Sequence, residues 1–276
     1  MHDRRTTLAR RDLASADLEG RIAARAYSTV APARVRASAT SVRIAADSSA
    51  EQIDQLLFGE VFDVLEATGL FAWGQARRDG YVGYVERDAL TTDVSAPTHW
   101  VSVPRTFAFE SPNIKATAFG PLSLNSLVSI DGEGGRLVHA RGAGWIAGSH
   151  LTPVGETLPD PAGVAEMFLG APYLWGGRDS LGLDCSGLVQ QALYACGRGC
   201  PRDTDQQASL GRDADPEDLR RGDLVFWRAH VGMMLDAERL VHANAHHMSV
   251  AIERLDDAAR RISRAGSGEP TSYRRL

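Results

Sequence analysis

The chain has 276 residues, 43% of them hydrophobic, which is enough for two or three domains with buried cores. Its formal net charge of −5 argues against the basic surface that a nucleic-acid-binding protein needs. The three cysteines include no Cys-x-x-Cys pair, so we expect neither a zinc site nor any other cofactor.

The N-terminus carries charges but lacks the apolar run of a secretion signal. It begins Met-His-Asp-Arg-Arg, with no stretch of seven or more apolar residues behind it. No segment has the length and apolar character of a membrane span. We therefore expect a cytoplasmic protein, whose reducing surroundings keep a reactive thiol free. The Ala- and Arg-rich residues 1–35 are expected to form a helical or disordered arm.

The next part of the chain, up to residue 155, contains a weak internal repeat. Short β-rich runs alternate with turn residues, and the six-residue spacing of Tyr84 and Leu90 recurs in Trp145 and Leu151. Both copies resemble bacterial SH3 domains, the first more closely than the second. We expect two small β-barrels here.

A candidate nucleophile follows a glycine-rich stretch. Cys185 opens a segment whose apolar residues have helix periodicity, which predicts a helix beginning at the cysteine. A thiol in the first turn of a helix meets unpaired backbone N–H groups and the positive end of the helix dipole, and both favour the thiolate. Cys196 and Cys200 are expected to be inert, packed thiols.

Two histidines downstream can supply a base and a group that orients it. His230 and His242 lie in β-rich runs on either side of a polar turn at residues 236–238. A turn centred on residue 236 would place them opposite each other, with Cβ atoms about 4.5–5.5 Å apart. Their even spacing keeps both rings on one face of the sheet in any neighbouring even register. Together with Cys185 they offer the three roles that a covalent hydrolase requires.

Another histidine pair follows closely. We expect His246 and His247 to be solvated or to form local hydrogen bonds, with a place at the edge of a substrate site as the alternative.

Four ordered motifs lie within residues 156–258. They are Tyr173-Leu-Trp175-Gly-Gly, Asp184-Cys185-Ser186-Gly-Leu, the segment from Pro201 to Gln207, and Arg221-Gly-Asp-Leu-Val-Phe followed by His230-Val-Gly. Together they resemble the NlpC/P60 family of papain-like cysteine peptidases, which act in bacterial cell-wall metabolism.

The resemblance implies a role for each matched residue. Cys185 would be the nucleophile, His230 the general base and then acid, and His242 the polar residue that fixes the imidazole. Substrate-binding roles are implied for seven more residues: Tyr173 near the oxyanion, Asp184 and Ser186 at the free amino end of the peptide, Trp175 and Thr204 in the same pocket, and Glu60 and Tyr81 from the first SH3-like block.

Glu60 and Tyr81 also have a purely structural interpretation. Glu60 follows a turn glycine and could be a surface charge, and Tyr81 could be an aromatic residue on a half-buried strand.

We therefore predict an α+β protein. Its parts are an arm at 1–35, SH3-like β-barrels at 36–94 and 95–155, and a papain-like NlpC/P60 domain at 156–276. The resemblance implies a cysteine endopeptidase that hydrolyses the γ-D-glutamyl–diaminopimelate bond of peptidoglycan-derived peptides during murein recycling. Its partner would be a peptide such as L-Ala-γ-D-Glu-diaminopimelate, and neither nucleic acid nor membrane. The alternatives are a non-catalytic peptide-binding module and a papain-like amidase or acyltransferase that acts on another amide.

Overall fold

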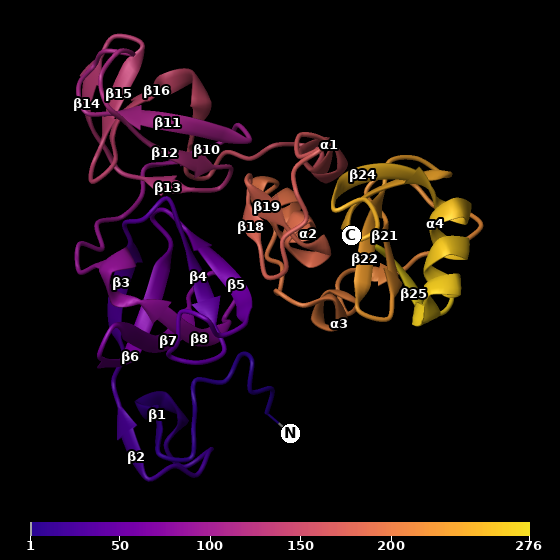
Figure 1. The fold of residues 1–276 in the computed structure, drawn as a ribbon, viewed down its shortest axis with the longest axis horizontal. Helices are drawn as coiled ribbons and strands as arrows, with labels where there is room; N and C mark the ends of the chain where they lie inside the picture. The colour runs from indigo at the N-terminus through magenta and orange to yellow at the C-terminus, as the bar shows by residue number, and fades with distance from the viewer. Residues whose placement is uncertain (1) are drawn as a thin grey trace. The chain divides into compact units, whose positions relative to one another are not determined.

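The computed structural model describes residues 2–276, which form two compact units (Figure 1). The first unit ends at Val154 and consists mainly of β-strands. The second runs from Gly155 to Leu276 and combines helices with a six-stranded sheet. Within residues 2–276, no helix has the length and apolar character needed to cross a membrane.

The N-terminal segment is extended chain that packs on the first SH3-like region. It contains β1 (Leu13–Ser15), a 3-10 turn (Ala16–Leu18) and β2 (Ala26–Ser28), and the two strands pair in parallel. Leu8 is buried in a cluster with Trp73, and the Arg10 guanidinium lies 4.0 Å from the centre of the Trp73 ring. The prediction of a helical or disordered arm is therefore wrong, because apolar burial and a cation–π contact hold this segment in place.

The first SH3-like region is a seven-stranded antiparallel sheet in the order β5-β4-β8-β7-β6-β3-β9. Its strands are β3 (Ala31–Val35), β4 (Ala39–Arg43), β5 (Gln52–Leu57), β6 (Val61–Thr68), β7 (Phe71–Ala76), β8 (Val82–Glu86) and β9 (Leu90–Thr91). Val42, Phe62 and Val85 are fully buried in its core. Because β3 pairs with β6 and β9, residues 31–35 belong to this sheet and not to the predicted arm.

The second SH3-like region has a five-stranded sheet, β12-β11-β16-β15-β14, and a three-stranded sheet, β13-β10-β17. Its strands are β10 (His99–Val101), β11 (Arg105–Phe109), β12 (Ala118–Ser123), β13 (Leu127–Val128), β14 (Ile130–Gly134), β15 (Leu137–Ala140), β16 (Gly144–Ala147) and β17 (Leu151–Pro153).

The sequence repeat corresponds to a repeated piece of structure. A 3-10 turn at Arg87–Ala89 joins β8 to β9, and another at Gly148–His150 joins β16 to β17. The two six-residue spacings therefore mark the same order of strand, turn and strand.

The second unit is organised around an antiparallel sheet in the order β20-β25-β21-β22-β23-β24. Its strands are β20 (Arg212–Asp213), β21 (Leu224–Trp227), β22 (His230–Met234), β23 (Arg239–Asn244), β24 (Ser249–Arg254) and β25 (Ser272–Arg275), with a separate hairpin of β18 (Arg178–Asp179) and β19 (Gly182–Leu183). Its helices are α1 (Pro161–Glu166), α2 (Cys185–Ala195), α3 (Thr204–Gln207), α4 (Leu255–Ile262) and a π-helical turn (Ser263–Ser267).

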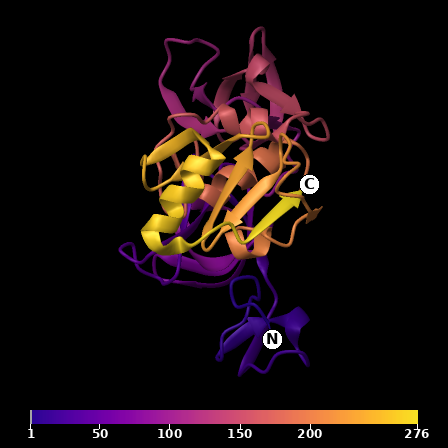
Figure 2. The same ribbon diagram turned by 90° about the vertical axis from the view of Figure 1, so that its right-hand side faces the viewer.

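Helices α2 and α4 lie on opposite faces of this sheet (Figures 1 and 2). Ala258 and Ile262 of α4 are buried with Val225 and Trp227 of β21. Residues of β22 at even positions share this face with Val225 and Trp227, because Val225 pairs with Gly232 and Trp227 with His230. His230 therefore lies on the face that α4 covers.

Candidate active site

Cys185 is the first residue of α2, which confirms the predicted helix start, and it is 7% exposed. Asp184 caps the helix, because its carboxylate accepts hydrogen bonds from the N–H groups of Gly187 at 2.8 Å and Gly176 at 2.9 Å. The backbone N–H groups of Val231 and Ser186 lower the pKa of Cys185 and so favour its thiolate. Helix α2 packs against β22, the strand that begins at His230 and contains Val231.

The unliganded site favours a neutral thiol and a neutral imidazole. Burial, followed by the negative charge of Asp184, raises the pKa of Cys185 to about 12 despite the N–H groups that favour its thiolate. Burial, followed by neighbouring His242 and Arg261, lowers the pKa of His230 to about 3. Burial therefore outweighs the effect of the helix terminus, which by itself favours the thiolate. We predict that His230 takes up the thiol proton as Cys185 attacks.

We expect kcat/KM for peptide hydrolysis to remain high well below pH 6.5, the ordinary pKa of histidine. A general base works only while it is unprotonated, and a pKa of about 3 keeps His230 unprotonated through mildly acidic pH. A pH profile of kcat/KM measures this, with circular dichroism at each pH to confirm that the protein stays folded. An acid limb centred near the ordinary histidine pKa would contradict the prediction.

The turn between β22 and β23 includes the predicted residues 236–238, but the predicted centre of the hairpin is wrong. Met234 pairs with Leu240, so the hairpin is centred on residue 237 and not on 236. Asp236 stabilises this turn by accepting two hydrogen bonds from backbone N–H groups within it. The predicted pairing of His230 directly opposite His242 is therefore wrong by two residues.

The two histidines nevertheless contact each other. A shift of two residues keeps both on the same face of the sheet, where they are diagonal neighbours. Gly232 lies directly opposite His242 in this register, and because it has no side chain, none stands between the rings. His230 Nε2 lies 2.8 Å from His242 Nδ1, and the Trp227 ring packs beside His230 with 5.7 Å between ring centres. His242 can therefore orient His230.

Glu253, which the sequence analysis did not single out, contacts His242 on the side away from His230. Glu253 Oε1 lies 3.0 Å from His242 Nε2 and 2.5 Å from a guanidinium nitrogen of Arg261 on α4. Burial alone would raise the pKa of Glu253, but hydrogen bonds from His242 and Arg261 outweigh it and lower that pKa to about 2. Ala251 of β24 pairs with His242, so Glu253 is a diagonal neighbour on the same face. Extending the predicted hairpin by a third strand would have revealed it.

The predicted aromatic residues lie in the segment before α2. Tyr173 is half-buried, and burial, followed by the charges of nearby Cys185 and Asp184, raises the pKa of its hydroxyl. This electrostatic coupling places Tyr173 close to the thiol. The Trp175 side chain is 58% exposed.

A buried arginine holds the residues on either side of the cysteine. Arg202 donates to Asp184 Oδ1 at 3.0 Å, to Asp184 Oδ2 at 2.5 Å and to Ser186 Oγ at 2.7 Å. With the N–H groups of Gly187 and Gly176 and a 3.2 Å contact from Ser186, the Asp184 carboxylate has five donors for roughly four lone-pair positions. A substrate ammonium group at Asp184 would have to replace one of them, most easily the long one from Ser186.

Thr204 begins α3, the short helix just after Arg202. Gln207 in the same helix donates to the backbone oxygen of Ser186 at 3.0 Å. Thr204 is thus held in a segment that is attached to the first turn of α2.

Glu60 and Tyr81 lie in the first unit. Glu60 is 2% exposed, pairs with Arg78 at 3.0 Å and accepts a hydrogen bond from the Leu57 N–H at 3.1 Å. The alternative interpretation of Glu60 as a surface charge is therefore wrong. Tyr81 is buried in the core of its sheet. The role of these residues in substrate binding stays a prediction from the family resemblance.

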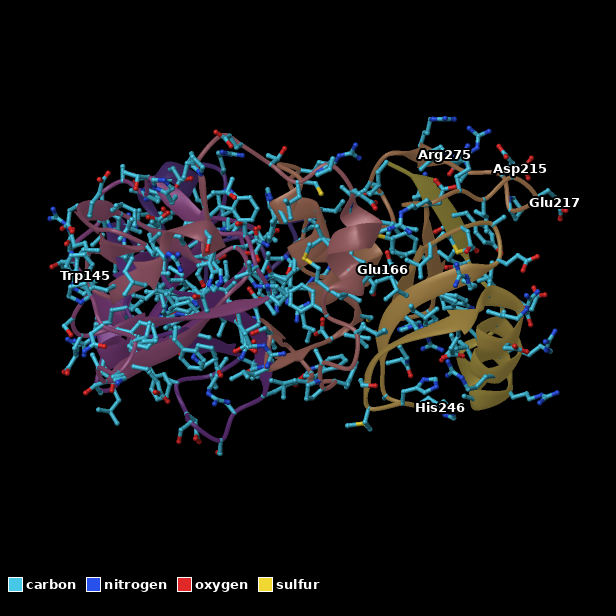
Figure 3. All side chains as sticks on the ribbon, turned by 90° about the horizontal axis from the view of Figure 1, so that it is seen from above. Trp145, Glu166, Asp215, Glu217, His246 and Arg275 are labelled. Carbon is cyan, nitrogen blue, oxygen red and sulfur yellow. The ribbon has the colours of Figure 1, made fainter. Side chains whose placement is uncertain are left out.

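The remaining histidines and cysteines show no arrangement that would hold a metal. Among residues 2–276, no three His, Cys, Asp or Glu side chains are grouped as metal ligands, and Cys185, Cys196 and Cys200 form no disulfide. His246 lies on the exposed outer side of the loop between β23 and β24 (Figure 3). His247 Nδ1 lies 3.0 Å from Asn244 Oδ1, which confirms its expected local hydrogen bonding.

Comparison with known protein families agrees with this geometry. Residues 170–262 match the model of the NlpC/P60 family. The chain carries an NlpC/P60 domain. Residues 42–90 match the bacterial dipeptidyl-peptidase SH3 domain, which lies within the first SH3-like region. The chain is thus a cysteine peptidase in which an SH3-like β-rich region precedes the NlpC/P60 domain, as the sequence motifs predict.

Two curated relatives match most of the length of the chain. The γ-D-glutamyl-L-lysine dipeptidyl-peptidase of Bacillus subtilis (strain 168) is 27% identical over 226 residues, covering 74% of this chain and 76% of that protein. A protein of the same name from Bacillus cereus is 27% identical over 230 residues, covering 72% and 69%.

A solved structure shows the same fold. The crystal structure of an NlpC/P60 family protein from Bacillus cereus ATCC 10987 superposes with a TM-score of 0.76 and 21% identity, covering 88% of this chain and 99% of that one.

Proposed function

We propose that this NlpC/P60 protein hydrolyses the γ-D-glutamyl bond to a diamino acid in short peptides derived from peptidoglycan. The observation that carries the proposal is the placement of Cys185 at the start of α2, which packs against β22, the strand that begins with His230 of the His230–His242 pair. The two Bacillus relatives are named for a peptidase acting at a γ-D-glutamyl-L-lysine linkage, which supports the bond type. We propose diaminopimelate as the diamino acid, on the family resemblance.

Acylation of the enzyme is the first half of the proposed reaction. The Cys185 thiol attacks the γ-carbonyl carbon of D-glutamate as His230 takes its proton, and the carbonyl oxygen becomes an oxyanion near Tyr173. Collapse of this intermediate breaks the C–N bond, and the His230 imidazolium protonates the departing amine of the diamino acid. The product is a thioester between Cys185 and L-Ala-D-Glu.

Hydrolysis of the thioester completes the cycle. His230 removes a proton from water, which attacks the thioester carbonyl, and the sulfur leaves and regains its proton. His242 holds the His230 ring during both steps. L-Ala-D-Glu is released, and no external co-reactant besides water is required.

Selection for a free amino terminus is the second part of the proposal. Asp184 and Ser186 flank the nucleophile in sequence, and the family resemblance assigns them to the amino end of the substrate, with Trp175 and Thr204 nearby. Glu60 and Tyr81 are proposed for the same task on the resemblance alone.

The amino-terminus proposal predicts a difference between two peptides. L-Ala-γ-D-Glu-diaminopimelate should be hydrolysed at least about 100-fold faster than its N-acetylated form, because acetylation removes charged hydrogen bonds of about 1.5–3 kcal/mol each. Rates by mass spectrometry, with the lysine-containing peptide in parallel, measure this. Equal rates would overturn the selection for a free amine. A conjugate formed with an added acceptor amine would indicate an acyltransferase instead.

We also propose a cytoplasmic location and a role in recycling murein peptides. Fractionation of cells that make the protein at its native level, followed by immunodetection, tests the location. Recovery outside the cytoplasmic fraction would contradict it.

A further inference from the structure

The hydrogen bonds beyond His242 decide where its proton lies. Glu253 Oε1 accepts a hydrogen bond from Arg261 at 2.5 Å. The Arg261 guanidinium is a fixed cation that keeps the Glu253 carboxyl ionised, so this carboxylate has no proton to donate. His242 Nε2 lies 3.0 Å from the same oxygen and must therefore be a donor. The proton of neutral His242 is thus on Nε2.

The same reasoning extends to His230. A neutral imidazole carries one proton, so His242 Nδ1 is an acceptor. His230 Nε2 lies 2.8 Å from that acceptor and must donate to it. The single proton of neutral His230 is then on Nε2, which leaves Nδ1 as the ring nitrogen that can take the proton from Cys185.

The opposite tautomer of His242 would remove the base. A proton on His242 Nδ1 would force His230 Nε2 to accept it, and the proton of His230 would move to Nδ1. His230 could then no longer remove a proton from the thiol with that nitrogen. His242 is 1% exposed, so bulk water does not stabilise one tautomer over the other, and the carboxylate of Glu253 makes the choice.

We infer that Glu253, anchored by Arg261, is a positioning residue that sets the tautomers of His242 and His230 and thereby makes His230 Nδ1 the general base. The inference rests on the proposed function, since it concerns the same site. Helix α4 would then contribute to the reaction, because it carries Arg261, which holds the Glu253 carboxylate in place. His247 is a further titratable group close to that oxygen, with its Nδ1 3.3 Å from Glu253 Oε1.

Substitutions of Glu253 test the inference through the kinetics. Glu253→Gln keeps the shape but can offer His242 either an oxygen or an N–H group, and Glu253→Leu removes the acceptor. We expect kcat to fall about 10-fold in the first and about 100-fold in the second, with KM unchanged, against about 10²–10⁴-fold for loss of a general base. Glu238→Gln is the matched control, because Glu238 pairs with Arg254 at 2.7 Å on the exposed surface.

Nitrogen-15 NMR of the imidazole rings tests it independently of peptide turnover. With histidines assigned from His230→Ala and His242→Ala, both rings should carry the proton on Nε2 in the unliganded wild type. The Glu253→Leu protein should show His242 with a mixture of tautomers, and Glu238→Gln should not. Unchanged tautomers in Glu253→Leu, or equal loss of kcat in Glu238→Gln, would overturn the inference. If Glu253→Leu does not fold, the Glu253→Gln spectrum is used instead, and unchanged histidine tautomers in that protein would overturn the inference.

The NMR result also separates this inference from the proposed function. If no γ-D-glutamyl peptide is hydrolysed but the tautomers change as expected, the positioning role stands and the substrate proposal falls. If the peptide is hydrolysed and the tautomers do not depend on Glu253, the substrate proposal stands and the positioning role of Glu253 falls.

Discussion

The Cys185→Ala protein should fold, bind peptide and hydrolyse it at least about 10⁴-fold more slowly than the wild type. Cys185 lies at the first turn of α2 beside β22. Within residues 2–276, the contacts described above for His230 and His242 include neither Cys196 nor Cys200. Product formation by mass spectrometry gives the rate, and calorimetric titration with L-Ala-γ-D-Glu-diaminopimelate gives the binding.

Cys196→Ala is the control for this prediction. Cys196 lies at the other end of α2, directly after its last residue, and its loss should leave kcat unchanged. Wild-type turnover by Cys185→Ala would show that the nucleophile is a different group.

Replacing Arg202 with methionine should lower the free energy of unfolding by about 3–5 kcal/mol, because it leaves a buried carboxylate without its partner. The Arg202 and Asp184 side chains are 1% and 8% exposed and lie 2.5 Å apart. Urea denaturation measures the change. Because Asp184 also caps the helix that begins with Cys185, kcat should fall in the fraction that remains folded.

Two further proteins make this prediction specific. Arg220→Met removes an arginine whose pair with Asp218 is exposed, and it should leave the unfolding midpoint nearly unchanged. Adding Asp184→Asn to Arg202→Met should recover part of the lost stability, because the unpaired charge is then gone. A loss in Arg202→Met no larger than in Arg220→Met would contradict the prediction.

Local rules predicted the parts of the site that depend on periodicity. The start of α2 at Cys185 follows from the apolar pattern after it. The shared face of His230 and His242 follows from their even spacing, which survives a register shift of two. That is why the contact between the histidines was predictable although their exact register was not.

The wrong or missing predictions concern features that depend on distant residues or on burial. The arm is ordered because Arg10 and Leu8 meet Trp73 more than sixty residues later. The thiol is neutral because burial, which the helix pattern does not reveal, outweighs the helix terminus. Glu253 requires the register of a third strand.

The mass spectrum of the products formed from L-Ala-γ-D-Glu-diaminopimelate tests the central claim most directly. A γ-D-glutamyl peptidase releases L-Ala-D-Glu and free diaminopimelate, and the Cys185→Ala protein leaves the peptide intact. Release of L-alanine, or an intact peptide after incubation with folded wild-type protein, would contradict the account.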